Sequence, residues 1–170
     1  MKWGMFAAGL AVGILLTLVL SQFFFAPAIV SVFSPDGGDD IIQLMDSAEQ
    51  SIDIEMYVFT SRDIVDALER AKSRGVKTRI IVERSTISGS NSEIFNELAA
   101  KGFNVRYASK AYKLTHSKIM IIDGKSVLVG SHNFSNSALY FNREASVIIK
   151  NHQTVSEFID AFETDWALAS

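Results

Sequence analysis

The sequence predicts an α/β fold, in which a mixed β-sheet is flanked by helices and preceded by one N-terminal hydrophobic helix. Segments with strand-like and helix-like periodicity alternate in the first part of the domain. Later, an Asp-Gly pair between two short apolar runs predicts a β-hairpin. A stretch from Trp3 to Pro35 carries no charge, and the 170 residues leave room for one folded domain beside it.

Residues 1–33 are predicted to be a transmembrane anchor or a signal peptide. The apolar run from Phe6 to Leu20 is interrupted by Gly and Thr alone. Together with the phenylalanines at 23–25 it reaches the length of about 20 residues that spans a bilayer. Ala26-Pro-Ala28 resembles a cleavage site, but the apolar run is longer than the usual signal-peptide core, which favours an uncleaved anchor. Lys2 predicts that the domain lies outside the cytoplasm, whereas cleavage would give a secreted or periplasmic protein.

Residues 34–170 are predicted to form the catalytic domain. A polar linker, 34–40, is followed by a helix over 41–48 with apolar residues at helical spacing. The apolar residues of 52–58 alternate, as expected of a strand. Ser61 is the predicted N-cap of a helix that ends near Gly75.

The second part of the domain continues the same alternation. A strand over 76–82, a helix over 91–101 and a strand over 103–107 are followed by the hairpin of 119–122 and 127–129. A strand over 145–149 and a C-terminal helix with apolar residues between Val155 and Trp166 complete the domain. This order predicts a mixed sheet between helices.

One segment contains the residues that indicate chemistry. From His116 to Asn133 it reads H-x-K-x4-D-x6-G-S-x-N, with Lys118, Asp123 and Ser131 at the intermediate positions. A lysine ammonium and an asparagine amide suit phosphate oxygens and the charge that develops on them. A histidine can attack phosphorus and form a covalent phospho-histidine. The segment therefore predicts a site for phosphodiester cleavage.

The hairpin is expected to gather these residues on one face. With a turn at 123–124, His116 lies opposite Ser131, and with a turn at 124–125 it lies opposite Asn133. Both registers collect the same four residues, and a three-residue loop alone would separate them: His116, Lys118, Ser131 and Asn133.

A nucleophilic imidazole needs one free nitrogen and a partner on the other, typically a carboxylate. Glu144, which opens the strand over 145–149, is the candidate for this partner. Asp123 belongs to the motif and is kept among the candidate catalytic residues. Its place at the turn also suits a role in stabilising the hairpin or a neighbouring segment of backbone.

The motif resembles the signature of the phospholipase D superfamily, and the chain carries it once. The resemblance implies an α/β sandwich from about Asp36 onward, a phospho-histidine intermediate, and a Glu that orients the His, which supports Glu144. Small single-motif members act as homodimers, so two copies of His116 would meet, one attacking and one donating a proton. Cysteine is absent, so there is no thiolate metal site, and the chain differs from Zucchini-type members whose zinc finger needs cysteines.

The charge distribution indicates where a polyanion would bind. The net charge is −3, yet basic residues gather in one segment around the motif, in which Lys110 and Lys113 are candidate substrate-binding residues beside Lys118 and Asn133. The alternative is that these lysines merely solvate a loop.

We therefore expect a phosphodiesterase that needs no metal or cofactor, and the activity that we favour is that of a non-specific endonuclease for DNA or RNA. A phospholipid hydrolase of the cardiolipin type, with the same mechanism, is the alternative that the membrane segment favours. A non-catalytic nucleic-acid-binding or membrane scaffold is a further alternative. The intact candidate site speaks against a scaffold, which has no need of a nucleophile.

Overall fold

The computed structural model describes residues 12–14, 29–84, 86 and 91–170. Seven strands form one sheet in the order β1-β7-β6-β5-β2-β3-β4. Strands β2, β3 and β4 are parallel and the other neighbours are antiparallel, so the prediction of a mixed sheet is confirmed. The strands are β1 (Ile29–Phe33), β2 (Ser51–Met56), β3 (Lys77–Val82), β4 (Asn104–Tyr107), β5 (Lys118–Ile122), β6 (Ser126–Gly130) and β7 (Ala145–Ile149).

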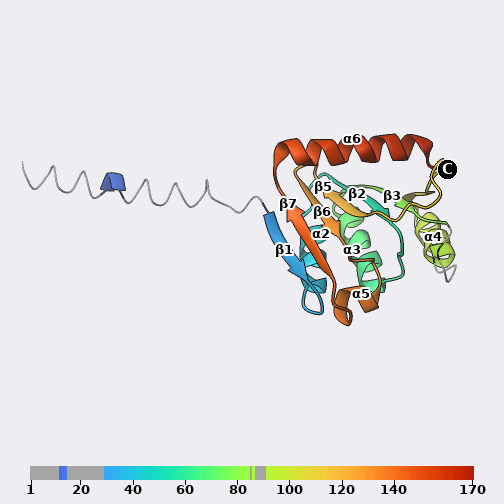
Figure 1. Cartoon of the computed structure of the whole chain (residues 1–170), viewed down its shortest axis with the longest axis horizontal. Coiled ribbons are helices and arrows are strands. Elements are labelled where there is room, and N and C mark those ends of the chain that lie inside the picture. Colours follow the sequence, from blue (N-terminus) through green and yellow to red (C-terminus); the bar gives the residue numbers. More distant parts are fainter. Residues whose placement is uncertain (1–11, 15–28, 85, 87–90) are drawn as a thin grey trace, which may run out of the picture.

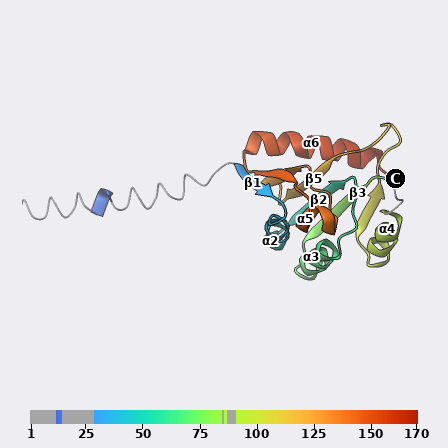
Figure 2. The ribbon, with the colours of Figure 1, turned by 60° about the horizontal axis from the view of Figure 1, so that its bottom comes forward.

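Helices cover both faces of the sheet (Figures 1 and 2), as predicted. Helix α6 crosses one face, and the helices that precede it cover the other. The two faces have separate cores: alternate residues such as Ile54 pack against the helices α2 and α3, whereas Ile121 packs against Val155 and Phe162 of α6. The helices of the domain are α2 (Gly38–Asp46), α3 (Arg62–Ser73), α4 (Asn91–Ala100), α5 (Asn136–Tyr140) and α6 (His152–Leu168).

The predicted membrane segment, residues 1–33, lies mostly outside the described residues. Residues 12–14 are helical, and no helix in the described part of the chain has the length and apolar character to cross a membrane. Residues 29–33 belong to the sheet, because β1 pairs with β7 and places Val32 in the core. The predicted polar linker begins with a turn, Ser34–Gly37, in which Ser34 is buried. The folded domain thus includes β1, and a turn joins β1 directly to α2.

The two helices α3 and α6 begin differently. Asn151 precedes α6, and its side-chain oxygen accepts a hydrogen bond from the Thr154 N–H at 3.0 Å. Ser61 stands at the N-cap of α3 as predicted, but its hydroxyl makes no capping bond and is buried without a hydrogen-bond partner among the described residues. Helix α5 was not predicted, since five residues are too few to show helical periodicity.

The hairpin forms where it was predicted, but neither predicted register is right. Asp123 and Gly124 both have positive φ, and the Lys125 N–H donates to the Ile122 carbonyl at 2.9 Å, as in a primed turn. The ladder nevertheless pairs Ile122 with Ser126, which leaves Lys125 as an extra residue on the β6 side. With this three-residue loop, Ser131 no longer lies on the same face of the hairpin as Lys118. Strand pairing alone therefore does not assemble the site.

The side chain of Asp123 explains this register. Its carboxylate accepts hydrogen bonds from the backbone N–H groups of Glu49, Gln50 and Ser51 at 2.7–3.2 Å. Its own N–H donates to the Ser51 carbonyl at 2.9 Å. Asp123 is therefore tied to the start of β2 and extends β5, so the additional loop residue has to fall on β6. Burial alone would raise the pKa of Asp123, but these backbone donors outweigh it and lower the pKa.

Replacing Asp123 with Asn should lower the free energy of unfolding by about 2 kcal/mol, because an amide cannot accept all of these hydrogen bonds. The folded-state pKa of Asp123 lies below its unfolded value. The stabilisation is therefore present above about pH 4 and is lost as the pH falls through the folded-state pKa. Urea unfolding at neutral and acidic pH measures both effects, with the exposed Asp160→Asn as control. An equal loss in the two variants would contradict this role.

Candidate active site

His116 lies at the edge of the sheet where β2 ends and β5 begins. The Tyr57 N–H, one residue beyond β2, donates to the Ser117 carbonyl at 3.0 Å and so extends the β2–β5 ladder past Lys118. His116 is exposed, and its ring lies against Tyr57 with 4.4 Å between the ring centroids and 48° between the planes. The nucleophile predicted from the motif is therefore accessible and has an aromatic support.

Lys118, the first residue of β5, completes this contact group. Its Nζ donates to the His116 carbonyl at 2.9 Å and lies 3.4 Å from His116 Nδ1 and 5.2 Å from the centroid of the Tyr57 ring. Burial lowers the pKa of Lys118, and the negative charge of Glu144 acts in the opposite direction. The structure thus brings the imidazole and the cation together, within the electrostatic reach of Glu144.

Two buried glutamates hold the residues on either side of His116. The Glu83 carboxylate accepts a hydrogen bond from the Thr115 N–H at 2.8 Å. Glu55, 2% exposed, has hydrogen-bonding contacts with Ser117 and Asp165. Burial raises the pKa of Glu55 to about 7; Ser117 opposes the rise and Asp165 adds to it.

Sequence reasoning missed both glutamates and Tyr57. Asp53 and Glu55 occupy the positions of β2 that alternate with its apolar residues and face α6, and an acid at such a position of a central strand was the available signal for Glu55.

Ser131 and Glu144 form a second group of predicted site residues. The Ser131 hydroxyl donates to Glu144 at 2.5 Å and accepts from the Ala145 N–H at 3.0 Å, while Asn142 donates to Glu144 at 3.1 Å. Burial favours a higher pKa for Glu144, but the donors Ser131 and Asn142 and the charge of Lys118 lower it. Glu144 is therefore held as a carboxylate. It forms no hydrogen bond to His116 within the described chain, so the predicted orienting contact is not made there.

Asn133 reaches the site by leaving the hairpin. After β6, the chain crosses the start of β5 and meets the extension of β2, where the Phe134 N–H donates to the Val58 carbonyl at 3.0 Å. Asn133 Oδ1 accepts from the Val58 N–H at 3.2 Å, one residue beyond Tyr57. Because its oxygen is engaged, the amide nitrogen is the atom that can donate to a phosphate oxygen.

The remaining candidates occupy different places. Asp123 is at the far end of β5 from His116, so the structure does not bring it to the site. Lys110 and Lys113 are exposed on the connection between β4 and β5 that leads to His116. This connection and the segment before Glu144 also expose large apolar side chains: Tyr112 49%, Leu114 42% and Phe141 79%.

His132, at the unspecified position of the motif, has a structural role. Ser34 donates its hydroxyl hydrogen to the Leu139 carbonyl at 2.9 Å, so it accepts from His132 Nε2 at 2.7 Å. His132 Nδ1 then accepts from the Ser146 hydroxyl at 2.7 Å. Burial lowers the pKa of His132, in agreement with this neutral tautomer. The site therefore contains one exposed imidazole, since His152 opens α6.

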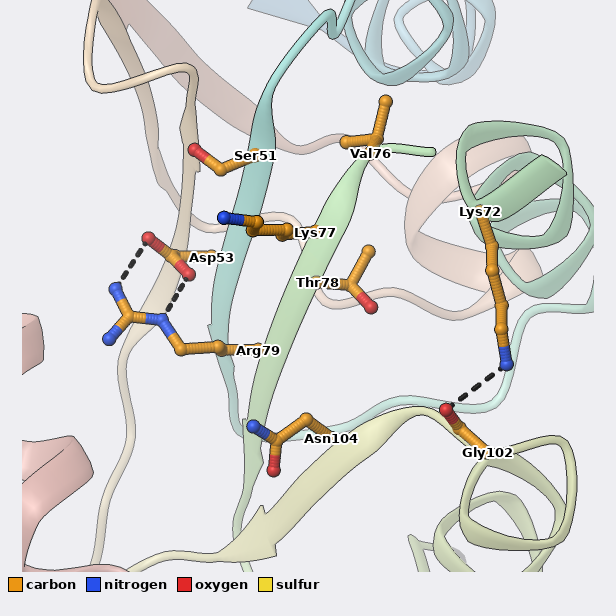
Figure 3. A pocket seen from close by; sticks show the side chains of 9 residues that line it. All are labelled: Ser51, Asp53, Lys72, Val76, Lys77, Thr78, Arg79, Gly102 and Asn104. Atoms are coloured by element: carbon orange, nitrogen blue, oxygen red, sulfur yellow. Dashed lines mark hydrogen bonds and ion pairs between the residues drawn. The ribbon is translucent and has the colours of Figure 1, made fainter. Parts of the chain in front are cut away.

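Other parts of the described surface offer less chemistry. No three His, Asp or Glu side chains in the described ranges gather as a metal ion would require. A groove of about 540 Å³ lies at the start of β2 and β3, the end of β2 away from Tyr57 (Figure 3). Arg79 in this groove is paired with Asp53 at 2.7 Å and with Glu163, so its charge is already compensated.

Comparisons with known proteins agree with this fold. Residues 41–166 match the family described as cardiolipin synthase, PLD-like domain. A phospholipase D of Rickettsia conorii is 33% identical over 129 residues, which cover 75% of this chain and 64% of the relative. The chain thus spans less than two thirds of that curated relative.

Two solved structures are similar over most of their length. Nuc from Salmonella typhimurium, a phospholipase D family member, is 30% identical with a TM-score of 0.78, over 85% of this chain and 97% of Nuc. NucT from Helicobacter pylori is 25% identical with a TM-score of 0.69, over 83% of this chain and 96% of NucT.

The raised pKa of Glu55 predicts a pH-dependent stability. Folded protein keeps a proton on Glu55 that the unfolded chain releases above its ordinary pKa of 4.5. Protonated Glu55 therefore contributes to the free energy of unfolding at low pH. This contribution, on the order of 3 kcal/mol, is lost as the pH rises toward and through 7. Glu55→Gln should remove this dependence, so that its stability relative to wild type rises between about pH 5 and about pH 8. Chemical denaturation with the exposed Glu157→Gln as control measures it, and a constant difference would contradict the assignment.

Proposed function

The chain belongs to the phospholipase D superfamily, and we propose that it hydrolyses phosphodiesters through a covalent phospho-histidine formed on His116. The observation that carries this proposal is the exposed imidazole in contact with the Lys118 ammonium at one edge of the sheet. A nucleophile beside a fixed cation is suited to an anionic phosphorus centre. The reaction draws on these side chains and needs no metal.

In the first step, His116 Nε2 attacks phosphorus, a P–N bond forms and the bond to the leaving oxygen breaks. Lys118 and the Asn133 amide bind the non-bridging oxygens and stabilise the developing charge. The Lys118 ammonium faces His116 Nδ1 in this structure, whereas attack through Nε2 needs the proton on Nδ1 and an acceptor beside it. Binding of the phosphate by Lys118 would free Nδ1, and Glu144 is the carboxylate we propose to hold it, from the same chain or from a partner subunit.

The second acid–base group comes, in this proposal, from a second copy of the chain. The leaving oxygen needs a proton and the intermediate needs an activated water. In the described part of the chain, His132 is enclosed by two serines and His152 lies at the start of α6, so neither can serve. A two-fold homodimer would supply the partner's imidazole as acid in the first step and as base when water breaks the P–N bond.

The substrate that we propose is nucleic acid. Lys110 and Lys113 are exposed on the segment that leads into His116. A polyanion binds more strongly when several cations lie along its path. A phospholipid is the second candidate, because Tyr112, Leu114 and Phe141 expose apolar surface around the same site. The similarity to a phospholipase D agrees with this second candidate. From Lys2 and the uncharged stretch that follows it, we infer that the domain lies outside the cytoplasm, either anchored by residues 1–33 or released by cleavage.

His116→Ala should abolish turnover, with a loss of at least about a thousandfold, because no other group can form the covalent intermediate. Cleavage of single-stranded DNA, of RNA and of cardiolipin vesicles is measured for the full chain in excess EDTA. Wild-type cleavage of DNA or RNA supports the nuclease, and cleavage of lipid alone would replace it by the lipid hydrolase. A His116→Ala protein that keeps substantial activity would rule out the mechanism.

If two chains complete one site, mixed dimers of wild type and His116→Ala should be inactive. When equal amounts of the two proteins are mixed and their subunits exchange at random, about a quarter of the dimers contain two wild-type chains. The activity should then be about a quarter of that of wild-type protein at the same total concentration. Sedimentation measures the dimer in parallel. Activity of one half, in simple proportion to the wild-type chain, would contradict a shared site, as would an active monomer.

A further inference from the structure

Tyr57 touches both groups that carry the proposed chemistry. Its ring lies 4.4 Å from the His116 ring, centroid to centroid, and the Lys118 Nζ lies 5.2 Å from the Tyr57 centroid. Tilted aromatic rings attract one another, and a cation is attracted to the face of a phenol ring. One aromatic side chain therefore contacts both the imidazole and the ammonium.

The backbone of Tyr57 is fixed from two sides. Its N–H donates to the Ser117 carbonyl at 3.0 Å, which ties it to the residue between His116 and Lys118. Its carbonyl accepts from Asn91 Nδ2 at 2.7 Å. Asn91 opens α4 and is buried; it also donates to the Glu83 carbonyl at 2.9 Å and accepts from the Phe59 N–H at 2.9 Å. The ring thus projects from a rigid junction of β2, β3 and α4.

We propose that Tyr57 is a positioning residue for the reaction: its ring packs against the His116 imidazole and limits the orientations from which His116 attacks phosphorus, and it keeps the Lys118 ammonium beside the imidazole until Lys118 binds the phosphate. This proposal rests on the proposed function, since it assigns Tyr57 to a site whose nucleophile is His116. The contact is made by the ring, so the phenol hydroxyl has no part in it.

The need for such a support follows from the surroundings of His116. The imidazole is exposed, and within the described chain Glu144 bonds to Ser131 and Asn142 instead of to His116. An exposed histidine without a fixed partner samples several rotamers, and a misplacement of about 1 Å can cost on the order of a hundredfold in rate. The Tyr57 ring restricts that freedom before any carboxylate partner engages Nδ1.

The test compares Tyr57→Phe, which keeps the ring, with Tyr57→Leu, which removes it, in the full chain. Phe95→Leu serves as the control for loss of an aromatic contact, because Phe95 stacks on Tyr107 at 3.9 Å, in a pair that includes neither His116 nor Lys118. Steady-state and single-turnover rates are measured on single-stranded DNA and on cardiolipin vesicles. The imidazole signals of the three histidines are followed by NMR in the same samples.

Tyr57→Leu should lower kcat by about tenfold to a hundredfold, with KM changed by less than about threefold, because orientation acts in the chemical step. Tyr57→Phe should stay within about threefold of wild type and rescue the rate of phospho-histidine formation. In the NMR spectra, Tyr57→Leu should shift the His116 signals and leave those of buried His132 unchanged.

Several outcomes would overturn the proposal. Tyr57→Leu with wild-type kcat would do so, as would unshifted His116 signals. A Tyr57→Phe variant as impaired as Tyr57→Leu would assign the role to the hydroxyl and remove it from the ring. If wild type cleaves neither substrate, the proposed function has failed, whereas the NMR comparison still reports on the contact between Tyr57 and His116.

Discussion

The site depends on one constraint, the simultaneous pairing of β2 with β5 and β3. β2 runs antiparallel to β5 and parallel to β3, so its carboxyl end meets the start of one neighbour and the end of the other. That geometry brings Tyr57 and Glu83 to His116, although they are distant in the sequence. Ligand sites in α/β sheets favour the carboxyl ends of parallel strands for the same reason. A shift in the β2–β5 register by one residue would turn Glu55 toward the opposite core.

Local patterns were enough to predict most of the fold. The alternation of β2 and the helical spacing of α3 reflect burial on one face, and burial is what such periodicity reports. β1 was missed because its apolar residues continue an uncharged stretch, in which a strand and the end of a hydrophobic segment have the same composition. Partner strands far away in the sequence decide such a case, and β7 supplies that partner here.

The candidate site shows a sharper division between what a sequence can and cannot predict. His116 and Lys118 lie together because residues two positions apart in extended backbone point to the same face. Asn133 reaches the same edge by a different route from the predicted hairpin pairing, since the chain after β6 crosses β5 and binds Val58. Asp123 controls the register through the backbone N–H groups at the start of β2, a contact between residues more than 70 positions apart. Periodicity carries no information about such a tertiary contact.

Ser34 gives the domain a fixed connection between its first strand and the edge of the sheet that carries His116. Through His132 it is fastened to the segment that carries Ser131 and Asn133, and through Leu139 to α5. The five residues of β1 extend over about 16 Å, with Ile29 at one end of the sheet and Phe33 at the edge that carries His116. The fold therefore fixes the position of His116 relative to Ile29. If the chain ahead of Ile29 is held at a surface, the domain sets both the distance of His116 from Ile29 and the direction in which His116 faces.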